Sequence, residues 1–325
     1  MKKPWILLAM ALFATPCLAK TTWNANTVWP AKNMHSVRLT EYAEKVKVAT
    51  KGELEIVVQT SGVLGYKGPQ LLKVVRDGRI PISDMLISGV AGDEKIFRIS
   101  TLPFLVRDFD ELRLLTDIAR PYFDKAAAKW NQKILYTAPW PGSGLWAKKK
   151  IITIKDLKGR KTRVYDMNSA LLMEAVGATP LVIPFSDLST ALRTGFIDCI
   201  ITSTPTAVDA RLWEVLMYFE PLNITFATNM VTVNLDAFDK LPKAQQDILV
   251  SLGKEQEEAA WEDVRRWGGD TEAIISKNGI ETVQPSKQFI SNLEKAAKVI
   301  WADWLKTATP DGKKIYEEFT KKVKR

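Results

Sequence analysis

A single arginine, Arg163, is the side chain that could bind an acidic ligand. It lies in the segment Asp156–Ser203, which reads DLKGRKTRVYDMNSALLMEAVGATPLVIPFSDLSTALRTGFIDCIITS. A guanidinium group can hold a carboxylate through two parallel hydrogen bonds. A buried guanidinium needs such a partner, because an unpaired buried charge costs about 3–5 kcal/mol. Arg163 therefore predicts a carboxylate-binding site, with an internal salt bridge to Asp166 as the alternative.

The elements around Arg163 alternate between strands and helices. The turn Lys158-Gly159 leads into the short strand that carries Arg163. A helix follows, then a strand at Pro180–Ile183, a helix that begins near Ser186, and a strand at Cys199–Thr202. This βαβαβ order predicts a parallel sheet with crossover helices. Such sheets bind ligands at the carboxyl ends of their strands, and the arginine lies near one of these ends.

Other side chains near strand ends could complete the site. Phe185 directly precedes a predicted helix and could pack on a ligand or fill the core. Thr202 and Ser203 end an apolar strand, where hydroxyl groups often face a cleft. They could equally cap a helix ahead of Pro205. Tyr66 is a weaker candidate, suggested only by its place after an earlier strand.

Several tryptophans stand at predicted junctions between elements. They are Trp29, Trp140, Trp146 and Trp213. An indole ring can stack on a ligand, although a junction tryptophan is more often structural. Several such rings together with one arginine favour an apolar or aromatic monocarboxylate as the ligand. Of these, Trp29, Trp140 and Trp213 are kept as candidate ligand contacts.

The chain lacks the residues on which most catalytic and metal sites depend. His35 is the only histidine, whereas catalytic triads need a histidine and most zinc sites need several. We expect His35, at the start of a helix, to be a surface or capping residue. The P-loop, dinucleotide-binding and G-x-S-x-G motifs are also absent. We therefore expect a binding protein and not an enzyme, with no catalytic residue, metal site or cofactor.

The first 19 residues have the pattern of a secretory signal peptide. Lys2 and Lys3 are positive, Trp5–Phe13 is apolar but too short for a stable membrane anchor, and Cys17-Leu18-Ala19 offers a cleavage site. We expect cleavage after Ala19 and export to the periplasm. A lipid on Cys17 is the alternative, which the preceding proline disfavours. Cleavage leaves Cys199 as the only cysteine, which excludes an intramolecular disulfide, and its apolar surroundings predict a buried thiol.

Composition and charge fit a globular protein of about two domains. The chain has 325 residues, 46% hydrophobic and 26% charged. The formal net charge is +9, and removal of Lys2 and Lys3 lowers it by two. The basic residues are scattered, except at 148–150 and 321–325, and no nucleic-acid-binding motif accompanies them. We expect a solvated basic surface and no nucleic-acid partner.

The rest of the chain predicts two α/β lobes and a helical end. Strands are expected at 22–27, 54–59, 82–88 and 134–138. Helices are expected at 34–50, 69–75, 108–130 with an interruption near Pro121, 242–275 with a candidate break at Gly268-Gly269, 286–307 and 311–323. The segment 139–144 breaks regular structure and indicates a crossover between lobes. The segment 223–234 is a candidate strand that returns to the first lobe.

The segment around Arg163 resembles the substrate-binding proteins of tripartite ATP-independent periplasmic (TRAP) transporters. The shared runs are DLKGRKTRV, VGATP and ALRTGFID, at the family's spacing. Weaker similarities at 62–65, 102–105 and 238–242 extend the resemblance over nearly the whole mature chain. It implies an α/β fold of two lobes, like that of type II periplasmic binding proteins. Crossover hinge strands would join the lobes, and a long helix would span both.

This resemblance also implies domain bounds and a function. Lobe I would comprise 20–140 plus 228–268, and lobe II 141–227 plus 269–325. A small organic carboxylate would be captured between the lobes and delivered to the TRAP permease subunits in the membrane. We expect a monomer. The alternatives are a C4-dicarboxylate or other organic-acid binder of the same family, an exported sensor, an enzyme on the same scaffold, and an ABC-type binding protein.

The resemblance assigns roles to three places in the predicted site. The family's carboxylate-binding arginine corresponds to Arg163, and its aromatic residue after the next strand corresponds to Phe185. A further ligand contact falls at Thr202 or Ser203.

Two positions differ from the family's pattern. Gly144 or Leu145 stands where some relatives have a second arginine, which disfavours a sialic acid or a simple dicarboxylate as ligand. Asp166 stands where relatives often have asparagine. Its carboxylate would repel a ligand anion unless it binds a ligand amine or hydroxyl group, or pairs with Arg163.

Overall fold

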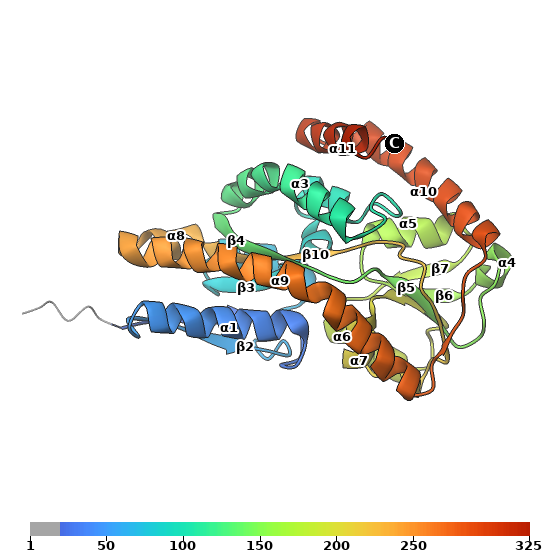
Figure 1. The fold of residues 1–325 in the computed structure, drawn as a ribbon, viewed down its shortest axis with the longest axis horizontal. Helices are drawn as coiled ribbons and strands as arrows, with labels where there is room; N and C mark the ends of the chain where they lie inside the picture. The colour runs from blue at the N-terminus through green and yellow to red at the C-terminus, as the bar shows by residue number, and fades with distance from the viewer. Residues whose placement is uncertain (1–19) are drawn as a thin grey trace, which may run out of the picture.

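The computed structural model describes residues 20–325 and shows two α/β lobes, each built on its own sheet (Figure 1). The predicted signal peptide and the alternative of a lipid on Cys17 lie outside the described residues. Within 20–325, every helix is too short or too polar to cross a bilayer.

Lobe I contains a five-stranded sheet in the order β2-β1-β3-β10-β4. The bounds in that order are Leu54–Gln59, Thr21–Asn26, Ile82–Leu86, Thr228–Asn234 and Gln132–Pro139. β1 pairs in parallel with β2 and β3, whereas β10 is antiparallel to β3 and β4. This confirms the predicted return strand, although it begins at Thr228 and not at Asn223. Because every residue of β10 is buried, the strand ties the second half of the chain into the core of lobe I.

Helices cover both faces of this first sheet. One face packs on α1 (Met34–Ala49) and the first half of α9 (Lys243–Lys277). The other face packs on α2 (Leu71–Arg76), α3 (Phe109–Lys129) and two short 3₁₀ helices, η2 (Ile87–Val90) and η3 (Lys95–Thr101). A third short 3₁₀ helix, η1 (Gly68–Gln70), contacts α2 and η2.

Lobe II contains a six-stranded sheet in the order β11-β9-β5-β8-β6-β7. The bounds in that order are Glu281–Thr282, Tyr218–Glu220, Gly144–Ala147, Cys199–Thr202, Lys161–Val164 and Thr179–Val182. β6 pairs in parallel with both β7 and β8, as the βαβαβ pattern predicts. β5, β9 and β11 have two to four residues each and were not predicted, because such short strands show no clear alternation.

The helices of lobe II connect these strands. They are α4 (Ile154–Leu157), α5 (Met167–Ala175), α6 (Phe185–Arg193), α7 (Thr204–Asp209) and η4 (Leu212–Glu214). Phe185 is thus the first residue of α6 and does not precede it. Cys199 is buried, as predicted. A short helix α8 (Leu235–Asp239) follows β10 in lobe I.

The long helix α9 contacts α1 and β4 in lobe I and α7 in lobe II, and so runs along both lobes (Figure 1). The predicted break at Gly268-Gly269 is wrong, because the helix continues through both residues. Gly268 packs on Pro141 in the crossover segment: a Cβ built on Gly268 would lie 3.5 Å from the proline Cγ. This packing outweighs the low helix propensity of glycine.

The predicted interruption of α3 near Pro121 is also wrong, since the helix runs from Phe109 to Lys129. A proline inside a helix removes one backbone hydrogen bond and usually bends the helix. Pro121 is exposed, and so is Asp117, whose backbone carbonyl group the proline leaves without a donor, so solvent can bind that carbonyl group.

The two C-terminal helices contact different lobes. α10 (Lys287–Thr307) packs on α5 of lobe II, and α11 (Pro310–Lys322) packs on α3 of lobe I. Ile315 and Phe319 of α11 are fully buried in the core that contains α3. The sequence placed all of 269–325 in lobe II. We propose instead that lobe II ends with α10 and that α11 belongs to lobe I.

The closest approach of α9 to the first sheet predicts a position that tolerates only glycine. A Cβ on Gly253 would lie 2.5 Å from the Leu135 backbone oxygen in β4. We expect Gly253→Ala to lower the free energy of unfolding by about 1–3 kcal/mol, because helix and strand must move apart. Urea unfolding measures this change.

Gly269→Ala is the matched control on the same helix. A Cβ there has no neighbour within 4 Å, so alanine should raise stability by up to ~1 kcal/mol through helix propensity. Equal stability of the two variants would contradict the close packing of α9 on β4.

Candidate functional site

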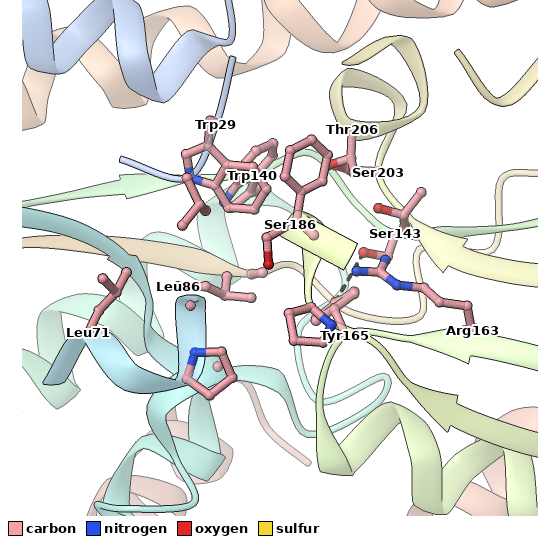
Figure 2. A pocket seen from close by; sticks show the side chains of 18 residues that line it. Trp29, Leu71, Leu86, Trp140, Ser143, Arg163, Tyr165, Ser186, Ser203 and Thr206 are labelled. Atoms are coloured by element: carbon pink, nitrogen blue, oxygen red, sulfur yellow. Dashed lines mark hydrogen bonds between the residues drawn. The ribbon is translucent and has the colours of Figure 1, made fainter. Parts of the chain in front are cut away.

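A cavity lies between the two lobes, where strand ends and helix starts from both sheets meet (Figure 2). It is lined by Val28, Trp29, Gly68, Pro69, Leu71, Leu86, Gly89, Trp140, Ser143, Arg163, Tyr165, Pro184, Phe185, Ser186, Thr202, Ser203, Thr206 and Ala227. The cavity has a volume of about 70 Å³, on a scale on which one water molecule needs about 10–15 Å³. It can therefore hold several waters or one small organic molecule.

Arg163 lies at the carboxyl-terminal part of β6 and is only 1% exposed. Its Nε donates to the Ile183 backbone oxygen at 2.9 Å, which fixes the guanidinium plane. Its Nη1 is buried and has no hydrogen-bond partner in the part of the chain that the structure describes. Among residues 20–325 no carboxylate lies within salt-bridge distance of it. Burial lowers the pKa of Arg163 to about 10, so the group still carries its charge at neutral pH.

Asp166 does not pair with Arg163, and it does not line the cavity. Its carboxylate caps the N-terminus of α5, accepting from the Ser169 backbone N–H at 2.9 Å. The other oxygen accepts from the Thr101 hydroxyl of lobe I at 2.6 Å. The internal salt bridge considered from the sequence is therefore not formed. Both carboxylate oxygens of Asp166 are already hydrogen-bonded, one in the cap of α5 and the other across the two lobes.

Three aromatic rings that the sequence nominated lie together on one side of the cavity. The Trp29 ring centre is 4.8 Å from that of Trp140 and 4.8 Å from that of Phe185. Trp29 and Trp140 belong to lobe I and its crossover, whereas Phe185 begins α6 of lobe II. We call these three residues the aromatic wall. Figure 2 shows its two tryptophans on the side opposite the Arg163 side chain.

His35 packs behind this wall. The sequence predicted a surface or capping residue at this position, and that prediction is wrong, because the side chain is buried and the helix is capped by Asn33. His35 is 3% exposed, and its ring centre lies 4.1 Å from that of Trp140. Burial lowers the pKa of His35 to about 3, so the imidazole is neutral at physiological pH. The sequence indicated the start of α1 but not that its first turn faces the core.

A chain of hydroxyl groups lies beside the arginine, and the sequence did not indicate it. The Tyr165 hydroxyl bonds to Ser143 Oγ at 3.1 Å and to Thr225 Oγ1. Burial raises the pKa of Tyr165, which keeps the phenol protonated. Tyr165 comes two residues after Arg163, just beyond the end of β6, and in extended backbone residues two apart point to the same side. This spacing of two residues is the sequence signal that could have identified Tyr165 as a neighbour of Arg163 in the site.

The remaining predicted residues divide into two groups. Thr202 and Ser203 line the cavity where β8 leads into α7, next to Thr206. Ser203 is the N-cap residue of α7, but its hydroxyl lies 3.4 Å from Thr206 Oγ1 and makes no capping bond. Tyr66 and Trp213 do not line the cavity: both are partly buried, Tyr66 against a core cluster of lobe I and Trp213 against one of lobe II.

The cavity therefore presents one cation against an otherwise neutral surface. Arg163 is the only charged residue among those that line it. Besides the hydroxyl groups, the lining consists of the aromatic wall, small glycine surfaces and aliphatic groups from both lobes. Such a surface suits a small anion with a compact apolar body and a few polar atoms.

The comparisons with known proteins agree on one family. Residues 25–307 match the family described as bacterial extracellular solute-binding protein, family 7 (DctP). Two similar crystal structures are extracytoplasmic solute receptors of Bordetella pertussis that bind pyroglutamic acid. DctP6 is 30% identical over 93% of this chain and 100% of its own, and DctP7 is 27% identical over 92% and 99%; both have a TM-score of 0.89.

A relative from Escherichia coli K12, the 2,3-diketo-L-gulonate-binding periplasmic protein YiaO, is 26% identical over 259 residues, or 77% of this chain and 76% of its own. The family match covers most of the chain, and the solved structures share its two-lobe fold at nearly full length. The chain therefore belongs to bacterial extracellular solute-binding protein family 7, the periplasmic receptors of TRAP transporters.

Proposed function

We propose that this protein captures a small, compact monocarboxylate, with pyroglutamate as the leading candidate, and delivers it to a TRAP permease. The observation that carries the proposal is the buried Arg163, whose Nη1 has no partner within the described chain. A ligand carboxylate would satisfy this group with two charge-assisted hydrogen bonds. The proposed role is binding alone, without a catalytic step.

The lining of the cavity supports a single carboxylate. A second carboxylate would have to be buried against neutral side chains, since Arg163 is the only charged residue there. Large polyhydroxylated acids would exceed the available space and meet mostly apolar atoms. A five-membered ring with one carboxylate and one amide could instead pack on the aromatic wall and bond to the hydroxyl groups. Pyroglutamate has these groups, and it is the ligand of the two similar Bordetella receptors.

Contacts between the lobes at the cavity support capture by closure. Lys67 of lobe I pairs with Asp187 of α6 at 2.9 Å, and Asn33 Nδ2 donates to Asp209 Oδ2 of α7 at 2.6 Å. The Trp29–Phe185 ring contact also joins the two lobes. A ligand that bonds to Arg163 in lobe II and packs on tryptophans of lobe I would add affinity only in the closed form. It would thereby shift the population towards closure.

The first prediction concerns ligand choice. We expect pyroglutamate to bind more tightly than succinate, L-glutamate and sialic acid, and to be recovered chemically unchanged. The excluded acids carry an extra charge or too large a body for this cavity. Isothermal titration calorimetry measures the affinities, and NMR of the released ligand tests for turnover. Tighter binding of succinate than of pyroglutamate would contradict the single-carboxylate assignment.

The second prediction separates ligand binding from folding at Arg163. We expect Arg163→Met to weaken pyroglutamate binding by about 2 kcal/mol or more, because the ligand carboxylate would be buried without its cation. The ligand-free variant should be as stable as the wild type or more so, since an unpaired buried charge has been removed. Calorimetry measures the affinity and urea unfolding the stability.

Arg193→Met is the matched control. Arg193 is an exposed residue at the end of α6, and its Nη2 bonds only to Thr190. Its replacement should leave both affinity and stability unchanged. Unchanged affinity in Arg163→Met, or a loss of affinity that merely follows a loss of stability, would remove the proposed role of the arginine.

A further inference from the structure

A buried polar relay lies directly behind the aromatic wall. The Trp140 Nε1 donates to Asn229 Oδ1 at 2.8 Å, and the Asn229 Nδ2 donates to Asp84 Oδ1 at 2.8 Å. The second oxygen of Asp84 accepts from the Thr27 hydroxyl at 3.1 Å. Asp84 and Asn229 lie on adjacent strands, β3 and β10, and neither lines the cavity.

The indole group sets the direction of every bond in this relay. A tryptophan N–H can only donate, so the atom of Asn229 that faces Trp140 must be the oxygen. The amide NH₂ of Asn229 then faces Asp84, which must accept. An ionised carboxylate fits this place because it accepts from both neighbours and has no donor of its own.

The burial of the Asp84 carboxylate is energetically unfavourable and needs an explanation. Asp84 is 1% exposed and has no cationic partner among residues 20–325. Burial raises the pKa of Asp84 to about 7, while the side chains of Asn229, Thr27 and Trp29 oppose that rise. A buried carboxylate without a cation is costly. An apolar residue in β3 would avoid that cost, so a purely structural account of this side chain is weak.

We propose that Asp84 is a positioning residue of the ligand cavity, acting through Asn229 to hold the Trp140 ring in the orientation that ligands pack against. The proposal rests on the function proposed above and extends it to residues that never touch the ligand.

The contacts of Trp140 explain why its orientation matters. Its backbone N–H donates to the Ala227 oxygen at 2.9 Å, which fixes the main chain and leaves the side-chain torsions free. The bond from Nε1 to Asn229 then fixes those torsions. Trp29 packs edge-on against this ring at an interplanar angle of 66°. A rotated Trp140 would therefore displace Trp29, and with it the surface that meets Phe185 of lobe II.

An exchange of the two relay residues tests the proposal. In Asn229→Leu, the Trp140 indole N–H loses its acceptor and Asp84 loses the Asn229 donor. In the double variant Asp84→Asn with Asn229→Asp, the new asparagine donates to the new aspartate and accepts from Thr27. The aspartate still accepts from Trp140, so every bond of the relay is restored.

We expect Asn229→Leu to weaken pyroglutamate binding about tenfold or more, and the double variant to bind within a few-fold of the wild type. The double variant keeps every bond of the relay, so it still tests the proposal if Asn229→Leu fails to fold. Asn24→Leu, at an exposed position on β1, is the matched control and should change nothing.

The indole N–H resonance of Trp140, assigned by its loss in Trp140→Phe, gives a readout that needs no ligand. We expect this resonance to move downfield in the double variant, because the acceptor changes from an amide to a carboxylate. If pyroglutamate is not the ligand, this shift still tests the relay.

Three results would overturn the proposal: wild-type affinity in folded Asn229→Leu, a double variant that stays as weak as the single one or does not fold, or an unmoved indole resonance. If the resonance moves but no variant or wild-type protein binds pyroglutamate, the ligand assignment fails and the relay stands.

Discussion

The buried charge of Arg163 is the interaction on which the rest of the site depends. The guanidinium is held by one backbone bond and has no carboxylate partner within the described chain. A closed protein with this group unpaired stores an unfavourable charge that a ligand carboxylate can relieve. Affinity and closure would then have one physical source, since the anion is best paired when both lobes exclude water. The nearby Asp166 leaves the arginine free for this role because it is engaged by Ser169 and Thr101.

The two lobes contribute different parts of the site. Lobe II supplies the cation and the tyrosine hydroxyl beside it, and lobe I with its crossover supplies the two tryptophans. In the proposed site, the cation would select for a carboxylate, and the tryptophans would select for the shape and polarity of the rest of the ligand. In the proposed relay, Asp84 and Asn229 extend this second function into the sheet of lobe I. The return strand β10 carries Asn229, so the crossing of the chain between lobes also connects the core of lobe I to the cavity.

Much of this arrangement could be predicted from the sequence, and particular residues show where prediction stopped. The strand–helix order after Asp156 predicted the parallel part of the second sheet, and with it the cavity-lining positions of Arg163, Phe185, Thr202 and Ser203. Trp29 and Trp140 were nominated as well, but Trp213 and Tyr66 pack elsewhere, because a junction residue carries no signal for which side it faces. The breaks expected at Pro121 and Gly268 do not occur, since exposure in one case and packing in the other override local propensity. The Asp84–Asn229–Trp140 relay joins residues up to 145 positions apart and has no local signature.

A crystal structure of the protein with pyroglutamate tests the central claim most directly. The account predicts the ligand carboxylate within hydrogen-bond distance of the Arg163 guanidinium, with Nη1 as one donor and the ring against Trp140 and Trp29. A ligand whose carboxylate lies away from Arg163, or a closed and ligand-bound structure in which Arg163 Nη1 still has no partner, would contradict it.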